Sequence, residues 1–285
     1  MKKVALYDLD SSNGGLAKYS EIKDDAFVGV LAVPPLTAPG EFFTGIMLDG
    51  EPDAVVVDLP GNPMKTFGAE VSEKVFVQTL FGCVNFDFVP VPVYPITEKS
   101  VSTDSLDNAL NLFESGPFGV CFNEFGLSAV LLDSGRGYPS YSRVEQRVKD
   151  RNGIEFSFPE MLKGSSKQAM DVDMKPFEVG FPVSASGARL SVSQQNAELA
   201  DWLTPRGYRS AQIRTVYMNE KIFYEAALPQ IESFVDRVLE RVGDAKPVFM
   251  PYSDKGGEGK SMMTRLLATY LRRYWANGIR FDNRQ

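Results

Sequence analysis

The chain has 285 residues, of which 44% are hydrophobic and 24% are charged, and its net charge is −7 at pH 7. This composition favours a globular protein of one large or two small domains, and the acidic balance argues against a dedicated nucleic-acid binder. The sequence contains no histidine, which excludes Ser-His-Asp and Cys-His catalysis and the usual zinc sites.

The cysteines and the apolar stretches indicate where the protein works. Cys83 and Cys121 stand alone in apolar surroundings and form no CxxC pair. A secreted domain of this length usually has more cysteines, so we expect a reducing cytoplasm. The run between the basic start and the first acidic residue is too short for a signal peptide. The longest apolar stretch, residues 26–36, is broken by two prolines, so we expect no transmembrane segment.

Short apolar runs that end in an acidic residue or a turn predict strands in the first half of the chain. Residues 53–59 (DAVVVDL) contain the β-branched run that is typical of a strand buried inside a parallel sheet. The apolar positions of residues 104–113 fall on one helical face, which predicts a helix there. The other strands predicted in this half are residues 3–9, 86–94, 118–123 and 153–158.

The second half of the chain begins with a polar, serine-rich segment, residues 163–208, for which we expect loops and short helices. Residues 219–242 predict an amphipathic helix or a pair of helices, the second starting at Pro229. A last strand at residues 246–251 precedes a helix at residues 262–274. Alternating strands and helices predict an α/β fold with a mostly parallel sheet, helices on both faces, and ligands at the C-terminal strand ends.

The segment Lys255–Ser261 (KGGEGKS) lies between this last strand and helix. That context favours a phosphate-binding loop, because glycines let successive backbone N–H groups turn inward and the helix N-terminus adds a positive field. Lys260 would contact the β- and γ-phosphates of ATP, and the Ser261 hydroxyl would bind Mg²⁺. The alternative is a mobile surface turn.

The loop departs from the ordinary P-loop pattern at its start. Asp254 stands where that pattern has glycine, and an additional lysine, Lys255, follows it. This combination resembles the deviant Walker A loop of the ParA/MinD family of ATPases. The resemblance implies a SIMIBI-type P-loop NTPase fold, ATP and Mg²⁺ as cofactors, and a homodimer in which Lys255 reaches the partner's phosphates. Glu258 replaces the small apolar residue of the family, and a carboxylate there should alter nucleotide affinity or hydrolysis rate.

The other motifs of the family follow a different order along the chain. Residues 4–10 (VALYDLD) resemble the strand that ends in D-x-D, so Asp8 is expected near the magnesium ion and Asp10 is expected to orient or deprotonate the attacking water. Residues 53–60 resemble the Walker B strand, whose Asp58 would hold a magnesium-bound water. Residues of the loop and of two later strands would contact the nucleotide: Gly256, Gly257, Glu258, Gly259, Lys260, Ser261, Met262, Asn123 and Pro159.

Joining Gln285 to Met1 would restore the family order of P-loop, helix, D-x-D strand and Walker B strand. The chain therefore resembles a circular permutant whose new ends lie in an exposed turn, where cuts are tolerated. We expect a single domain over residues 1–285, made of three parts. These parts are residues 1–162 with the acidic and base-side strands, residues 163–245 with variable loops and helices, and residues 246–285 with the P-loop unit.

Several of these residues have a simpler interpretation. An aspartate that ends a strand, such as Asp58, can cap a turn, and Asn123 can close a loop. Arg265, Arg272 and Arg273 recur along the last helix and either contact DNA phosphates or form a solvated face; the acidic net charge favours the second. Residues 231–242 form either a membrane-targeting helix, as in MinD, or a core helix, which their acidic residues favour.

We therefore expect a cytoplasmic ATPase switch of the ParA/MinD type that forms a homodimer when ATP is bound. Its output would be partition of plasmid DNA, positioning of a cargo or a role in conjugation, with DNA or a DNA-bound adaptor protein as partner. Two alternatives stay open. One is a nucleotide-gated adaptor that binds ATP with little hydrolysis, and the other is a non-enzymatic interaction protein.

Overall fold

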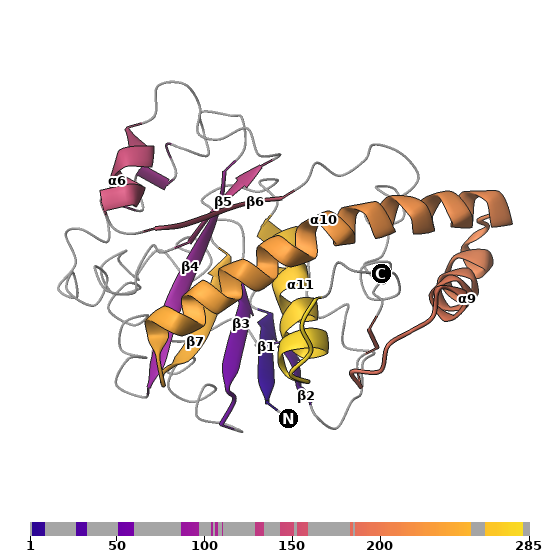
Figure 1. Cartoon of the computed structure of the whole chain (residues 1–285), viewed down its shortest axis with the longest axis horizontal. Helices are drawn as coiled ribbons and strands as arrows, with labels where there is room; N and C mark the ends of the chain where they lie inside the picture. Colours follow the sequence, from indigo (N-terminus) through magenta and orange to yellow (C-terminus); the bar gives the residue numbers. More distant parts are fainter. Residues whose placement is uncertain are drawn as a thin grey trace.

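The computed structural model of the chain describes the following residues: 2–8, 27–32, 51–59, 87–96, 104, 106, 107, 110, 129–133, 143–150, 153–158, 183, 184, 186–251 and 260–281. Within these ranges the chain folds as an α/β structure, with a sheet crossed by one long helix (Figure 1). The first half of this long helix extends beyond the sheet, and a shorter helix lies beside its far end.

One sheet contains all the strands that the structure describes, in the spatial order β2-β1-β3-β7-β4-β5-β6. The strands are β1 (Val4–Asp8), β2 (Phe27–Ala32), β3 (Ala54–Asp58), β4 (Phe88–Ile96), β5 (Ala129–Asp133), β6 (Ile154–Phe158) and β7 (Lys246–Pro251). Each neighbouring pair is parallel, which confirms the predicted parallel sheet. The last strand in sequence, β7, occupies the centre of the sheet, between β3 and β4.

The helices lie mostly in the second half of the described chain. They are α6 (Val144–Asp150), α9 (Val192–Leu203), the 3₁₀ turn η3 (Thr204–Arg206), α10 (Ser210–Val242), α11 (Lys260–Tyr270) and the π-helical turn η4 (Leu271–Trp275). The last two confirm the helix predicted at residues 262–274, which begins two residues earlier. Residues 104, 106, 107 and 110 are helical as predicted, and Leu106 and Leu110 are buried.

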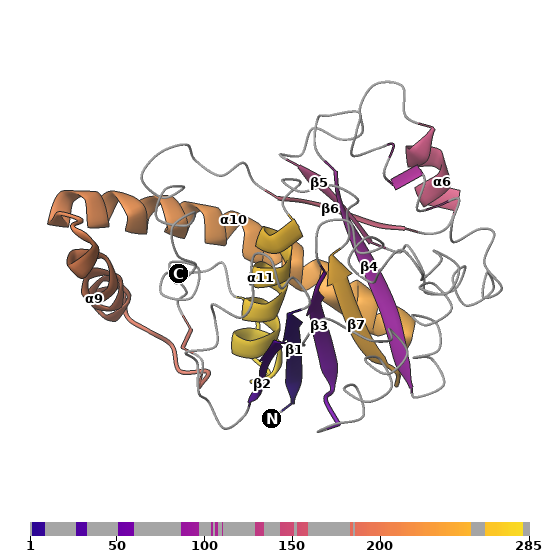
Figure 2. The ribbon, with the colours of Figure 1, turned by 180° about the vertical axis from the view of Figure 1, so that it is seen from behind.

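The central strands are buried on both faces, as a parallel sheet requires. On one face, Phe234 of α10 stacks on Phe156 of β6 and meets Phe249 of β7 edge-on, with ring centroids 4.3 and 5.9 Å apart. Helix α10 crosses in front of the sheet in Figure 1 and lies behind β3 and β7 in Figure 2. On the other face, Tyr7 of β1 and Val57 of β3 are completely buried.

Most of the predicted strands are confirmed. The predictions at residues 3–9, 53–59, 86–94, 153–158 and 246–251 correspond to β1, β3, β4, β6 and β7. Two strands were not predicted: β2, which lies in the apolar stretch at residues 26–36, and β5, the run AVLLD. The predicted strand at residues 118–123 lies outside the described part of the chain.

The helix predicted at residues 219–242 is longer than expected. Helix α10 is one continuous helix, Ser210–Val242, and it contains Pro229 in its interior. Proline lacks the N–H that would bond to the carbonyl four residues earlier and normally breaks a helix. Leu228 and Ile231, on either side of it, are completely buried, so packing against the core holds both halves in place. Pro229 therefore does not start a second helix.

Residues 163–208 also contain more regular structure than predicted. Helix α9 spans three turns, and its N-terminus has a capping box in which Ser191 and Gln194 each bond to the other's backbone N–H. Its buried residues Leu199 and Leu203 pack with Ile213 of α10 in a small separate core. The helix is polar apart from this narrow apolar face, which explains why its periodicity is weak in the sequence.

Candidate functional site

Two buried carboxylates end neighbouring strands of the sheet. Asp8 is the last residue of β1 and Asp58 the last of β3, and the two are register partners. Their exposed fractions are only 4% and 1%. Asp8 follows Leu6 by two residues, and Asp58 follows Val56 by two residues. Alternate residues of a strand point to the same face, so both aspartates lie on the face of the sheet that α11 covers. Strands lie about 4.8 Å apart, so the structure brings these two predicted metal-site residues side by side.

Lys260 lies at the same edge of the sheet. It is the first residue of α11, it is 6% exposed, and its ammonium group donates a hydrogen bond to the carbonyl oxygen of Leu59. Leu59 directly follows Asp58. The lysine of the glycine-rich segment is therefore held at the tip of the predicted Walker B strand, although 201 residues separate the two bonded residues in sequence. A cation at this point offsets the cost of burying carboxylates.

Thr264 connects the helix to the strand. Its hydroxyl lies 3.2 Å from Oδ1 of Asp58 and 3.0 Å from the carbonyl oxygen of Lys260, and the residue is completely buried. The single hydroxyl hydrogen is shared between these two acceptors, so Thr264 links the Asp58 carboxylate to the first turn of α11. Thr264 was not predicted as a site residue, although its spacing of four from Lys260 places both residues on one side of the helix.

The strand and the helix on the two sides of the glycine-rich segment are confirmed, and the segment itself lies outside the described residues. Strand β7 ends at Pro251, and α11 begins at Lys260 and packs against β3 and β7. The helix N-terminus therefore lies at the edge where the parallel strands end. The unpaired N–H groups and the macrodipole of a helix favour an anion at this point.

Several predicted site residues lie outside the described ranges. These are Asp10, Asn123, Pro159, Lys255, Gly256, Gly257, Glu258 and Gly259. Ser261 and Met262 belong to the first turn of α11, which brings their backbone to the same edge as Asp8 and Asp58. The structure therefore brings together Asp8, Asp58 and the start of α11.

The donor set at this edge suits a hard cation that is shared with a phosphate. Mg²⁺ prefers oxygen ligands and is usually bound by one or two carboxylates together with substrate phosphates and water. Asp8 and Asp58 provide such carboxylates. Among the described residues no group of three or more His, Cys, Asp or Glu side chains gathers that would hold a metal by itself.

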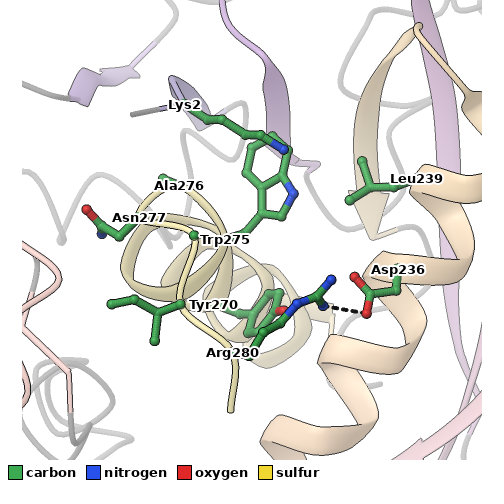
Figure 3. A pocket seen from close by; sticks show the side chains of 10 residues that line it. Lys2, Asp236, Leu239, Tyr270, Trp275, Ala276, Asn277 and Arg280 are labelled. Carbon is green, nitrogen blue, oxygen red and sulfur yellow. Dashed lines mark hydrogen bonds and ion pairs between the residues drawn. The ribbon is translucent and has the colours of Figure 1, made fainter.

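The beginning of the chain lies beside the end of the last helix. The backbone N–H of Lys2 donates to the carbonyl oxygen of Ala276 at 3.1 Å, and the Lys2 ammonium lies 4.2 Å from the centre of the Trp275 ring. Figure 3 shows this contact at the side of a cavity of about 570 Å³. Across the cavity, Arg280 bonds to Asp236 at 2.5 Å. The charged groups that line the cavity thus contact groups of the protein itself.

Tyr270, the last residue of α11, links this helix to α10 near the same cavity. Burial and the nearby Glu232 carboxylate raise the pKa of Tyr270. The phenol therefore stays protonated and donates to Glu232 at 3.3 Å. Phe281 also donates its backbone N–H to Glu232, at 3.2 Å. These hydrogen bonds connect the end of α11 and the segment after it to Glu232 of α10.

Two of the three arginines, Arg272 and Arg273, do not belong to the solvated face that was expected, and Arg265 is half-buried. Arg272 and Arg273 are only 9% and 7% exposed, and Arg273 donates to the carbonyl oxygen of Val183 at 2.8 Å. They are therefore packing residues rather than a surface for DNA. The core interpretation of residues 231–242 is confirmed, because Phe234 and Val238 are buried. Within the described ranges, no helix is long and apolar enough to cross a membrane.

Comparisons of the chain with protein-family models, with curated proteins and with solved structures give no match. The parts of the candidate site are two paired carboxylates, a buried lysine and the N-terminus of α11.

We predict that the hydroxyl of Thr264 stabilises the fold through Asp58. Replacing Thr264 with Val should lower the free energy of unfolding by about 1–3 kcal/mol, because a buried carboxylate loses a hydrogen bond. Thr264→Ser should recover most of the loss. Denaturant unfolding measures the difference.

Thr269 provides a matched control for this substitution. Its hydroxyl bonds to the carbonyl four residues earlier on the same helix, at 2.8 Å, and it is 3% exposed. Thr269→Val therefore removes a hydrogen bond to a helix carbonyl but no hydrogen bond to a carboxylate. Equal losses for Thr264→Val and Thr269→Val would contradict the proposed role of Asp58.

Proposed function

We propose that this chain binds ATP with magnesium at the edge where β1, β3 and β7 end, and that it hydrolyses the nucleotide. One observation carries the proposal. Lys260, which opens the helix after the glycine-rich segment, is held beside Asp58, and Asp58 is paired with Asp8. An ammonium group, two carboxylates and a helix N-terminus at one sheet edge are the groups that a magnesium–triphosphate complex needs.

In this proposal the glycine-rich segment binds the phosphates. Its backbone N–H groups and the N-terminus of α11 would surround the anion, and Lys260 would turn from the Leu59 carbonyl to the β- and γ-phosphates. The hydroxyl of Ser261 and the carboxylate of Asp58 would hold magnesium, with Asp8 next to them. Bound magnesium neutralises charge that develops on the transferred phosphoryl group.

Hydrolysis further requires an oriented water molecule. Phosphoryl transfer depends mainly on positioning and on charge stabilisation, so one suitably placed carboxylate is sufficient. Asp10 follows β1 by two residues and is the residue we propose for this role. Asn123 and Pro159 are proposed to line the nucleotide base.

The protein would then be a P-loop ATPase similar to the ParA/MinD family, with its sequence circularly permuted. Two observations support the permutation. β7 and α11, from the end of the chain, pack beside β3, and Lys2 bonds to Ala276 just after the last helix. The segment that follows α11 thus passes next to the segment that enters β1. A covalent connection there would give the usual order of P-loop, D-x-D strand and Walker B strand.

The family resemblance also suggests an assembly and an output. We propose a homodimer that forms when ATP is bound and in which Lys255 contacts the phosphates of the partner. A cytoplasmic switch of this type would act in the partition of plasmid DNA, in positioning of a cargo or in conjugation, through DNA or a DNA-bound adaptor protein.

Glu258 favours a second candidate function. A carboxylate inside a phosphate-binding loop repels the anion and disturbs the charge balance of hydrolysis. The chain would then be an adaptor that binds ATP and changes conformation with little turnover. Tight ATP binding together with negligible phosphate release would support this second function and exclude the first.

We expect phosphate release from ATP to depend on magnesium and on Lys260. Lys260→Ala should lower the rate at saturating ATP by about 100-fold or more, because a preorganised cation at the transferred phosphoryl group is lost. Lys149→Ala, at an exposed lysine of α6 paired with Glu145, is the control and should keep the wild-type rate.

The same proteins allow a test of binding without turnover. A ligand that binds the folded state raises the melting temperature, so Mg-ATP should stabilise the wild type and the Lys149→Ala variant. An unchanged melting temperature for the wild type would indicate that the loop is a simple turn and that the chain is a non-enzymatic interaction protein.

The permutation predicts that the chain can be reordered. We expect a protein that begins at Asp244, continues to Gln285, and is joined by a short Gly/Ser linker to residues 1–243 to fold and to bind ATP as the original does. The new ends fall at exposed residues between α10 and β7, where cuts are tolerated. Circular dichroism and ATP titration provide the measurement. A reordered chain that does not fold would contradict the proposed connection.

A further inference from the structure

The outward face of the first half of α10 has an unusual composition. A row of exposed or half-buried side chains follows it at alternating spacings of four and three residues. Its members are Ala211, Thr215, Met218, Ile222, Glu225 and Pro229. Solvated helix faces are normally charged or polar, yet this row has a single charged residue. We call it the α10 row.

The two large apolar side chains of the α10 row are the strongest sign of a missing partner. Met218 and Ile222 are each 52% exposed and lie one turn apart. Among the described residues, one other large apolar side chain is exposed, Val192 at the start of α9. These two neighbouring groups form a small apolar patch on one helix face.

The fold uses other faces of this helix. Ile213, Val216 and Tyr217 are buried and pack with α9, and from Phe223 onwards α10 packs on the sheet. Figure 1 shows the first half of α10 extending beyond the sheet towards α9. The α10 row therefore lies on the side of the helix that faces neither α9 nor the sheet core.

We propose that a second copy of this chain docks on the α10 row, so that two α10 helices pack antiparallel about a two-fold axis next to residue 220. Met218 of each copy then faces Ile222 of the other, and Ala211 faces Pro229. Alternating spacings of four and three are the period of a helix–helix seam. The 19 residues from Ala211 to Pro229 span about 28 Å, which is long enough for a stable helix pair.

Charge complementarity selects an identical copy as the occupant. Arg214, which precedes Thr215 of the α10 row, and Glu225, the charged member of the row, are both exposed, and Glu225 also lies 3.6 Å from the ammonium group of Lys221 one turn earlier. In the antiparallel pair, Arg214 of one copy lies beside Glu225 of the other, and the two-fold axis repeats this contact. In a parallel, in-register pair Arg214 and Glu225 would lie about 16 Å apart along the helices and could not meet. The surface is thus self-complementary, as a two-fold interface requires.

The α10 row contains none of the residues proposed for ATP binding. The pairing is therefore expected without nucleotide, and it does not rest on the proposed ATPase function. It would be an interface separate from the ATP-dependent dimer proposed above.

The test is the mass of the nucleotide-free protein in solution. Sedimentation equilibrium at tens of micromolar protein should give about 63 kDa for the wild type, which is two chains of 31.5 kDa. Ile222→Lys places two cations in the seam and should weaken dimerisation by about 10-fold or more. Gln230→Lys, at an exposed position beside the α10 row, is the control and should remain dimeric. Helicity by circular dichroism checks that each variant is folded.

A charge exchange tests the antiparallel register. Arg214→Glu and Glu225→Arg should each weaken the dimer, and the double variant should restore it. A nucleotide-free wild type that is monomeric overturns the proposal, as does a dimer that Ile222→Lys leaves unchanged. A dimer that forms only with ATP overturns it too, while supporting the ATPase. Binding of monomeric wild type, but not Ile222→Lys, to phosphatidylglycerol vesicles would assign the α10 row to lipid and also overturn it.

Discussion

Three buried charged groups at one edge of the sheet determine how the rest of the structure is arranged. Asp8 and Asp58 are register partners on adjacent strands, and the ammonium group of Lys260 is fixed to the carbonyl oxygen that follows Asp58. Removing charges from water is expensive, and a buried charge whose partner is removed costs about 3–5 kcal/mol. The position of α11 relative to β1 and β3 is therefore constrained electrostatically as well as by apolar packing. Thr264, which bonds to Asp58, adds a directional constraint.

The end of the chain occupies the middle of the sheet, where β7 pairs with both β3 and β4. β7 lies between β3 and β4, and the bond from Lys260 to Leu59 joins residues 201 positions apart. The entry to β1 is in turn held to the exit of the last helix by the bond between Lys2 and Ala276. Both ends of the described chain thus belong to one structural unit. In this unit Lys260 lies at the same sheet edge as Asp8 and Asp58. The proposed permutation rests on this proximity of the two ends.

The sequence predicted the parts of the fold that depend on strong local patterns. The valine run before Asp58 and the apolar segment of β7 are so apolar that they have to be buried. Both were predicted as strands, and both are strands in the structure. The extent of α10 was not predictable, because the cost of Pro229 is offset by core contacts that only the folded chain provides. At the site, motif spacing identified Lys260 and Asp58. Motif spacing did not indicate a role for Thr264. Its contact with Asp58 exists only because α11 packs against β3, and the sequence does not show which strand the helix packs against.

The central claim is that one magnesium–ATP complex is shared by the lysine of α11 and the carboxylates of β1 and β3. Titration calorimetry with ATP, with and without Mg²⁺, tests it most directly when wild type and Asp58→Asn are compared. Our account predicts one ATP per chain, bound about 10-fold or more tightly with Mg²⁺ in the wild type, and a smaller effect of Mg²⁺ in Asp58→Asn. ATP binding that is absent, or that depends equally on Mg²⁺ in both proteins, would contradict it.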